Sequence, residues 1–133
     1  MRGTYILVMY LEKDTKIRIG KLGVKRFLKG YYCYVGSALG KITNLENRIG
    51  RHRRLNKEKK GNLRWHIDYL LVNKVSIKNI IAFNKKIECK VSKYLERNSN
   101  RTINGFGSSD CKCKGHLHYF KNLGVLKKSI KGI

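Results

Sequence analysis

Apolar runs and polar–apolar alternation predict the strands of this chain. Residues 4–12 (TYILVMYLE) are apolar, β-branched and aromatic, which is typical of a largely buried strand. Alternation over 16–20 (KIRIG) suits an edge or hairpin strand, and alternation over 75–83 (VSIKNIIAF) predicts another strand. Residues 116–120 (HLHYF) are the last predicted strand.

The segment 30–40 (GYYCYVGSALG) concentrates tyrosines in one further predicted strand. Successive side chains of a strand point to opposite faces, so Tyr32 and Tyr34 share one face. The opposite face carries Tyr31, Cys33 and Val35. One face is expected to pack a core, and the pair of phenols is either merely half-buried or available for chemistry.

A helix is expected to begin at Thr43, because Thr43 and Glu46 have the spacing of a capping box. One face of this helix repeats with helical spacing and carries Leu45, Ile49 and His52. Further helices are predicted over 63–72 (LRWHIDYLLV), where the residues are apolar almost all round, and over 87–98 (IECKVSKYLERN).

The order of these elements predicts one mixed α+β domain over residues 1–121. A small central sheet is expected, with helices flanking it. Residues 122–133 are rich in lysine and are predicted to be a loose, basic C-terminal tail. The apolar start of the chain is interrupted by Glu12, so neither a signal peptide nor a membrane span is expected, and the predicted location is cytoplasmic.

Charge changes this picture most. The chain has 31 Lys and Arg against 8 Asp and Glu, a formal net charge of +23. A field of this strength opposes folding through self-repulsion, and polyanions are its natural counterpart. A lysine-rich surface of the kind found in thermophiles is the alternative, but ion-pair networks need more glutamate than this chain has. The charge therefore favours a nucleic-acid partner and no membrane partner.

Residues suited to phosphodiester hydrolysis lie at the predicted element ends. One strand supplies Tyr5, another supplies Tyr34, and Gly36 permits close approach of backbone or ligand. The capped helix adds Arg48 and His52 on one face, and Glu88 opens a later helix. A guanidinium stabilises phosphate charge, a carboxylate binds Mg²⁺, and surrounding cations favour a phenolate base.

Blocks of residues in this order resemble the GIY-YIG nuclease superfamily. They are Gly3-Thr4-Tyr5, Tyr34-Val35-Gly36, Asn44-Leu45 with Arg48 and His52, and Glu88. The strings GYYCYVGSALG, RWHIDYLL and GFGSSDCKCKGHLHYF are similar to one branch, the Uri-type domain of prokaryotes. That branch occurs alone or fused to endonuclease III-like DNA-repair glycosylases, and the resemblance spans roughly residues 3–120.

The resemblance implies an endonuclease that uses Mg²⁺ or Mn²⁺ and has a mostly antiparallel sheet flanked by helices. In such enzymes a motif tyrosine activates water, the helix arginine clamps the phosphate, and the glutamate binds the metal. These roles fall on Tyr5 or Tyr34, with Tyr5 favoured as the base, and on Arg48 and Glu88. His52 occupies a position that is tyrosine or histidine in the superfamily.

The chain departs from the family pattern at three places. Thr4 replaces the usual isoleucine, a swap between β-branched residues that we expect to be harmless. The long separation of Tyr5 and Tyr34 implies an inserted hairpin at about residues 13–30. Ser37 stands where excision-repair relatives often carry lysine, so that Lys41 is the expected substitute for this phosphate contact.

A basic run follows the start of the predicted helix. A solvated helix face is the ordinary reading of such a run, but the net charge favours a surface that tracks phosphates. The predicted nucleic-acid-binding residues are Gly36, Ser37, Lys41, Arg51, Arg53, Arg54 and Lys57. His66 and Asp68 are expected to have structural roles, with substrate contact as the alternative.

The cysteines admit two readings. Cys111, Cys113 and His116, with Cys89 or His118 as a fourth ligand, have residue types that bind zinc tetrahedrally. Reduced, partly buried cysteines are the ordinary alternative and the favoured one.

For the protein as a whole, a DNA endonuclease acting in repair or processing is the first hypothesis. A non-catalytic nucleic-acid-binding module on the same scaffold is the second. DNA versus RNA, and monomer versus homodimer, stay open.

Overall fold

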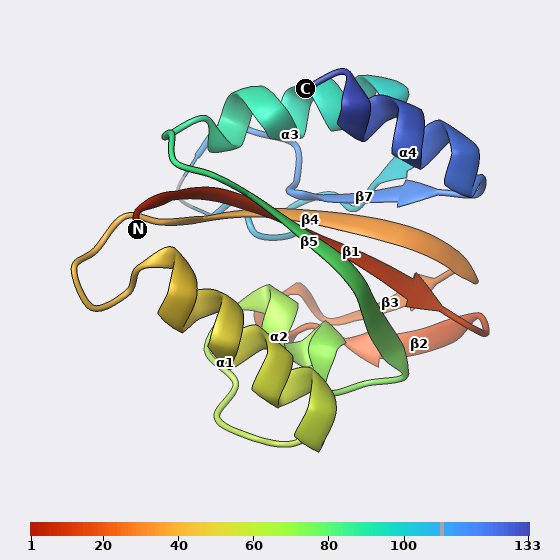
Figure 1. Cartoon of the computed structure of the whole chain (residues 1–133). Coiled ribbons are helices and arrows are strands. Elements are labelled where there is room, and N and C mark those ends of the chain that lie inside the picture. The colour runs from red at the N-terminus through yellow and green to blue at the C-terminus, as the bar shows by residue number, and fades with distance from the viewer. Residues whose placement is uncertain (110) are drawn as a thin grey trace.

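The computed structural model describes residues 1–109 and 111–133 and contains one antiparallel sheet between two pairs of helices (Figure 1). The strand order is β5-β1-β4-β7-β6. Its strands are β1 (Gly3–Leu11), β4 (Gly30–Ala38), β5 (Val75–Phe83), β6 (Arg101–Thr102) and β7 (Leu117–Phe120). A separate hairpin pairs β2 (Thr15–Arg18) with β3 (Val24–Phe27), and a 3₁₀ turn, η1 (Gly20–Leu22), joins them.

The helices cover the two faces of the sheet in pairs (Figure 1). On one face lie α1 (Leu45–Glu58) and α2 (His66–Leu71), and on the other lie α3 (Glu88–Asn98) and α4 (Leu123–Lys131). The predicted α+β class, with a central sheet flanked by helices, is confirmed. In the described part of the chain, none of the helices has the length and apolarity needed to cross a bilayer.

Alternation along β1 and β4 builds two cores, one on each face of the sheet. Tyr5, Leu7 and Tyr32 pack with α1 and α2 in the first core. Ile6 and Cys33 pack with α3 and α4 in the second. Strand period alone sorts these side chains, because successive residues of a strand point to opposite faces.

The inserted hairpin is where the sequence predicted it. Strands β2 and β3 both fall within residues 13–30, and Ile17 and Phe27 bury their side chains in the first core. The strand predicted over 75–83 has the observed bounds of β5. The helix predicted over 63–72 is shorter, since α2 begins only at His66.

The predicted cap of α1 is wrong by one residue. Asn44, not Thr43, is the N-cap: its side-chain oxygen accepts a hydrogen bond from the backbone N–H of Asn47 at 2.9 Å. Glu46 does not close a capping box, because its carboxylate binds the amino group of Met1 at 2.7 Å. An Asn at the N-cap satisfies the same unpaired N–H groups as a Thr would.

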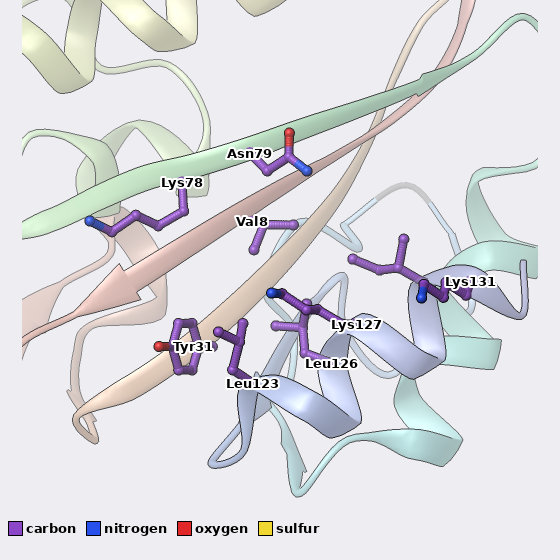
Figure 2. A pocket seen from close by; sticks show the side chains of 9 residues that line it. Val8, Tyr31, Lys78, Asn79, Leu123, Leu126, Lys127 and Lys131 are labelled. Atoms are coloured by element: carbon purple, nitrogen blue, oxygen red, sulfur yellow. The ribbon is translucent and has the colours of Figure 1, made fainter.

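The segment expected to be a loose tail forms helix α4. Asn122 caps this helix, and Leu126 and Ile130 pack in the second core. An adjoining groove of about 490 Å³ is lined by apolar side chains and by Lys78, Lys127 and Lys131 (Figure 2). These lining residues are distinct from the predicted catalytic residues.

Candidate functional site

Two predicted catalytic side chains and the predicted metal ligand line one cavity of about 280 Å³. Tyr34 comes from β4, Arg48 from α1 and Glu88 from the first turn of α3. The rest of the lining is Ser37, Arg64, Trp65, His66, Gly107 and Ser109. A phenol, a guanidinium and a carboxylate that are far apart in the sequence therefore share one opening.

Pairing of β1 with β4 brings together Tyr5 and Tyr34, the two tyrosines predicted to be catalytic. In this antiparallel register Tyr5 lies opposite Gly36, and Leu7 lies opposite Tyr34. The rings of Tyr5 and Tyr34 have centroids 6.3 Å apart. The hairpin between the strands lengthens the connection without changing this pairing.

Gly36 permits the position of the Tyr5 ring. A Cβ atom at residue 36 would lie 2.5 Å from the phenol oxygen of Tyr5, closer than real contacts allow. Gly107 has a similar relation to the Tyr34 ring, at 3.1 Å, and its φ of +68° is in the left-handed region that favours glycine. Both glycines thus shape the space around the tyrosines.

Tyr5 is buried behind the cavity and hydrogen-bonded to His52. Its hydroxyl lies 2.6 Å from Nε2 of His52. Burial raises the pKa of Tyr5 well above its ordinary value, the nearby Tyr34 raises it further, and the charge of Arg48 only partly opposes this. Burial also lowers the pKa of His52 to about 4, so the imidazole is neutral near pH 7.

The neutral ring of His52 has one nitrogen without a partner among residues 1–109 and 111–133. Its Nδ1 is buried and makes no hydrogen bond to any residue that the structure describes. The hydrogen bond to Tyr5 therefore fixes the imidazole of His52, which lies on the apolar face of α1.

Arg48 is held in place on two sides. One guanidinium nitrogen donates to the carbonyl of Ser37 at 2.9 Å, and the guanidinium lies 4.4 Å from the centre of the Trp65 ring. Stacking on an aromatic face suits the planar, permanently charged group of arginine. The Ser37 contact is made by its backbone, a role that the side-chain pattern did not indicate.

Glu88 lies in the first turn of α3, a helix that packs against β4. Its side chain is 29% exposed, and Oε2 is 3.5 Å from Nδ1 of His116. The turn before it is held by Thr4, whose hydroxyl donates to the carbonyl of Lys85 at 2.8 Å and accepts from the N–H of Ile87 at 3.0 Å. Thr4 therefore positions the start of α3, a role that sequence reasoning missed.

Arg51 is committed to an ion pair. Its guanidinium binds both carboxylate oxygens of the fully buried Asp68, at 2.7 and 2.9 Å. Burial opposes the charge of Asp68, but hydrogen bonds from Arg51 and from the N–H groups of Trp65 and Arg64 hold its pKa below the ordinary value. This geometry gives Arg51 a structural partner, while its contact with phosphates stays a prediction, and it fits the structural role expected of Asp68.

His66 is a cavity residue. Its Nδ1 accepts a hydrogen bond from the N–H of Gly107 at 2.9 Å, and burial lowers its pKa. It thereby joins α2 to the loop that carries Gly107. Substrate contact, which was the alternative for His66, is open to it from this position.

The other predicted basic contacts are exposed. Arg53, Arg54 and Lys57 lie on the outer side of α1, and Lys41 lies in the loop before it. Unlike Arg51, they present their charge to solvent, and none of them lines the cavity.

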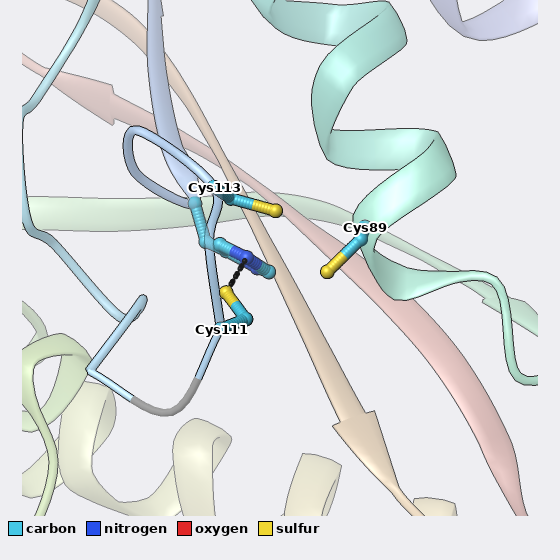
Figure 3. A group of neighbouring side chains, drawn as sticks. Cys89, Cys111 and Cys113 are labelled. Atoms are coloured by element: carbon cyan, nitrogen blue, oxygen red, sulfur yellow. Dashed lines mark hydrogen bonds between the residues drawn. The ribbon is translucent and has the colours of Figure 1, made fainter.

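The cysteine cluster brings together residues from two distant parts of the chain. Cys89, Cys111, Cys113 and His116 place their ligand atoms within 4.8 Å of one another (Figure 3). His118, the alternative fourth ligand, is used elsewhere: its two nitrogens contact the hydroxyls of Ser92 at 2.8 Å and Thr102 at 2.7 Å.

Comparison with known proteins places the chain in one family. The model described as domain of unknown function DUF123 matches residues 4–133, so the chain belongs to this family. Comparison with curated proteins gave no significant match. Comparison with solved structures likewise gave none.

Proposed function

We propose that this DUF123 chain is a metal-dependent endonuclease that hydrolyses phosphodiester bonds, with DNA as its substrate. One observation carries the proposal: Tyr34, Arg48 and Glu88 line the same cavity. These are the residue types needed to activate water, to stabilise phosphate charge and to bind a hard metal ion. The resemblance to GIY-YIG nucleases implies the same roles for Arg48 and Glu88, and it implies the base role for Tyr5 or Tyr34.

Glu88 fits the metal role. Its carboxylate lines the cavity and is partly exposed, and Mg²⁺ binds proteins through one or two carboxylates while it keeps several waters. When bound there, Mg²⁺ or Mn²⁺ supplies Lewis-acid stabilisation of the phosphate.

Arg48 binds the nonbridging phosphate oxygens in this proposal. Because the Ser37 carbonyl and the Trp65 ring already hold its guanidinium, little side-chain freedom is lost when phosphate binds. A held donor is also favourable in the transition state, where charge on these oxygens increases.

Tyr34 orients the attacking water and accepts its proton. This assignment departs from the sequence analysis, which favoured Tyr5 as the base. Tyr5 is 1% exposed, is bound to His52, and has a strongly raised pKa, all of which oppose a role as phenolate. Tyr5 acts instead as a positioning residue behind Tyr34.

The basic side of α1 supports nucleic acid as the substrate. Arg53, Arg54, Lys57 and Lys41 are exposed, and the whole chain has a net charge of +23. Contacts of these side chains with flanking phosphates release counterions, which gives affinity without sequence preference.

A cleavage assay over several substrates tests the proposal. Single-stranded, duplex, branched and damaged DNA, with RNA alongside, are incubated with Mg²⁺, Mn²⁺ or EDTA. We expect cleavage of DNA that EDTA stops. Tight binding without cleavage on every substrate would refute the proposal and select the non-catalytic binding module.

A further inference from the structure

The cluster of Cys89, Cys111, Cys113 and His116 joins two distant parts of the chain (Figure 3). Cys89 is in the first turn of α3, and the other three residues precede β7. The three sulfur atoms point toward one another, and Nε2 of His116 lies 3.3 Å from Sγ of Cys111 (Figure 3).

These separations exceed the edges of a tetrahedron around a metal ion by at most about 1 Å. With Zn–S bonds of about 2.3 Å and Zn–N bonds of about 2.0 Å, tetrahedral ligand atoms lie roughly 3.5 to 3.8 Å apart. All four ligand atoms here are within 4.8 Å of one another. Small rotations of the cysteine side chains therefore complete the geometry, and the backbone can stay in place.

The imidazole of His116 is oriented as a ligand. Its Nδ1 lies 3.2 Å from the carbonyl oxygen of Val35, which can only accept, so Nδ1 carries the proton. The lone pair of Nε2 then faces the sulfur atoms. A backbone carbonyl that accepts from the other ring nitrogen, and so fixes the tautomer, is typical of histidines that bind zinc.

The net charge of the occupied site also suits this chain. When three thiols bind Zn²⁺ they lose their protons to solvent, and the site has a net charge of −1 with neutral His116. That charge is favourable in a chain of net charge +23. Closed Cys₃His sites with four protein ligands are structural zinc sites.

We propose that Cys89, Cys111, Cys113 and His116 bind one structural Zn²⁺ that fastens the N-terminus of α3 to the segment before β7. The site is separate from the predicted Mg²⁺ ligand, yet Cys89 follows Glu88 directly, and His116 lies 3.5 Å from its carboxylate. The zinc therefore positions Glu88, a consequence that rests on the proposed function. The zinc site itself does not.

Metal analysis of the purified full chain tests the site without any activity assay. The protein is expressed with zinc supplementation under reducing conditions, dialysed and analysed for all metals by mass spectrometry. We expect about one zinc per chain, as four protein ligands of this type hold the ion through dialysis. The Cys111→Ser/Cys113→Ser variant should hold at least tenfold less.

Cys33 provides the matched control, since it is a free cysteine buried in the second core and outside the cluster. The Cys33→Ala variant should keep the wild-type zinc content. If the double serine variant fails to fold, Co²⁺ replaces zinc in the wild-type protein, where thiolate-to-cobalt absorption bands report sulfur ligation.

Four results would overturn the proposal. They are substoichiometric metal in the wild type, iron in place of zinc, a disulfide within the cluster under these reducing conditions, and cobalt spectra without sulfur bands. Loss of cleavage in a protein that contains zinc would instead count against the nuclease proposal alone.

Discussion

The hydroxyl of Tyr5 lies 2.6 Å from Nε2 of His52, and both side chains are buried behind the cavity. Strand β1 supplies one partner and helix α1 the other, so this bond ties the sheet to the helix that carries Arg48. A buried imidazole without its partner retains a polar atom that water cannot reach.

Tyr5→Phe should therefore destabilise the protein by about 1–3 kcal/mol, because Nε2 of His52 is left unpaired. Urea unfolding measures this change. Tyr10→Phe is the matched control, since Tyr10 is on the same strand and only half-buried. Equal stability of the two variants would contradict the structural role of the Tyr5–His52 bond.

Arg51→Ala should destabilise the fold on the order of 3 kcal/mol, because it leaves the buried carboxylate of Asp68 without its guanidinium. Arg53→Ala, two residues away on the exposed side of α1, should change stability by less than about 0.5 kcal/mol. Thermal and urea unfolding compare the two. If Arg51→Ala is as stable as Arg53→Ala and weakens DNA binding instead, Arg51 belongs to the nucleic-acid surface.

Stability should fall as pH is lowered below about 6.5. Burial lowers the pKa of His52 to about 4 and that of His118 to about 3, from an ordinary value of 6.5. Between these values the unfolded chain binds protons that the folded chain does not, so acid favours unfolding. The contribution of these histidines to stability is fully present above pH 6.5 and is lost progressively toward pH 4.

Urea midpoints at pH 7.0, 6.0 and 5.0 measure this slope before most carboxylates titrate. His52→Asn should make the slope shallower, since it removes one of the three histidines, His52, His66 and His118, whose pKa burial lowers. An unchanged slope would show that folding does not lower the pKa of His52.

Much of the fold is predictable because strand alternation reports burial directly. The sides taken by Tyr31, Tyr32 and Cys33 follow from strand period alone. Helix ends are less predictable, because Asn44 and Thr43 are both suitable caps and only the path of the backbone selects between them. The C-terminal helix was missed because the abundance of lysine favoured a tail, although Leu126 and Ile130 have helical spacing and Asn122 is a suitable cap.

The residues of the candidate site could be named from the sequence. The role proposed for each side chain could not. Sequence spacing names Tyr5, Tyr34, Arg48 and Glu88 without showing which side chains reach solvent. Burial of Tyr5 and the Arg51–Asp68 pair depend on tertiary packing, which no local pattern records. The hydroxyl of Thr4 is a similar case, since its partners are more than 80 residues away in the chain.

Tyr34→Phe should reduce the cleavage rate by roughly 10²–10⁴-fold, the usual effect of removing a general base. Tyr5→Phe should reduce it less, because Tyr5 does not line the cavity. Single-turnover rates at saturating protein separate this effect from DNA binding. A larger loss in Tyr5→Phe than in Tyr34→Phe would return the base assignment to Tyr5.

The most direct test compares metal-dependent DNA cleavage by the wild type with that by Arg48→Ala and Glu88→Gln. Circular dichroism and metal content establish that each variant is folded. Arg18→Ala and Glu96→Gln are matched controls, since Arg18 is exposed on β2 and Glu96 is near the far end of α3. The account predicts at least about 100-fold slower cleavage in both site variants and wild-type rates in both controls. Robust cleavage by folded Arg48→Ala or Glu88→Gln protein would contradict it.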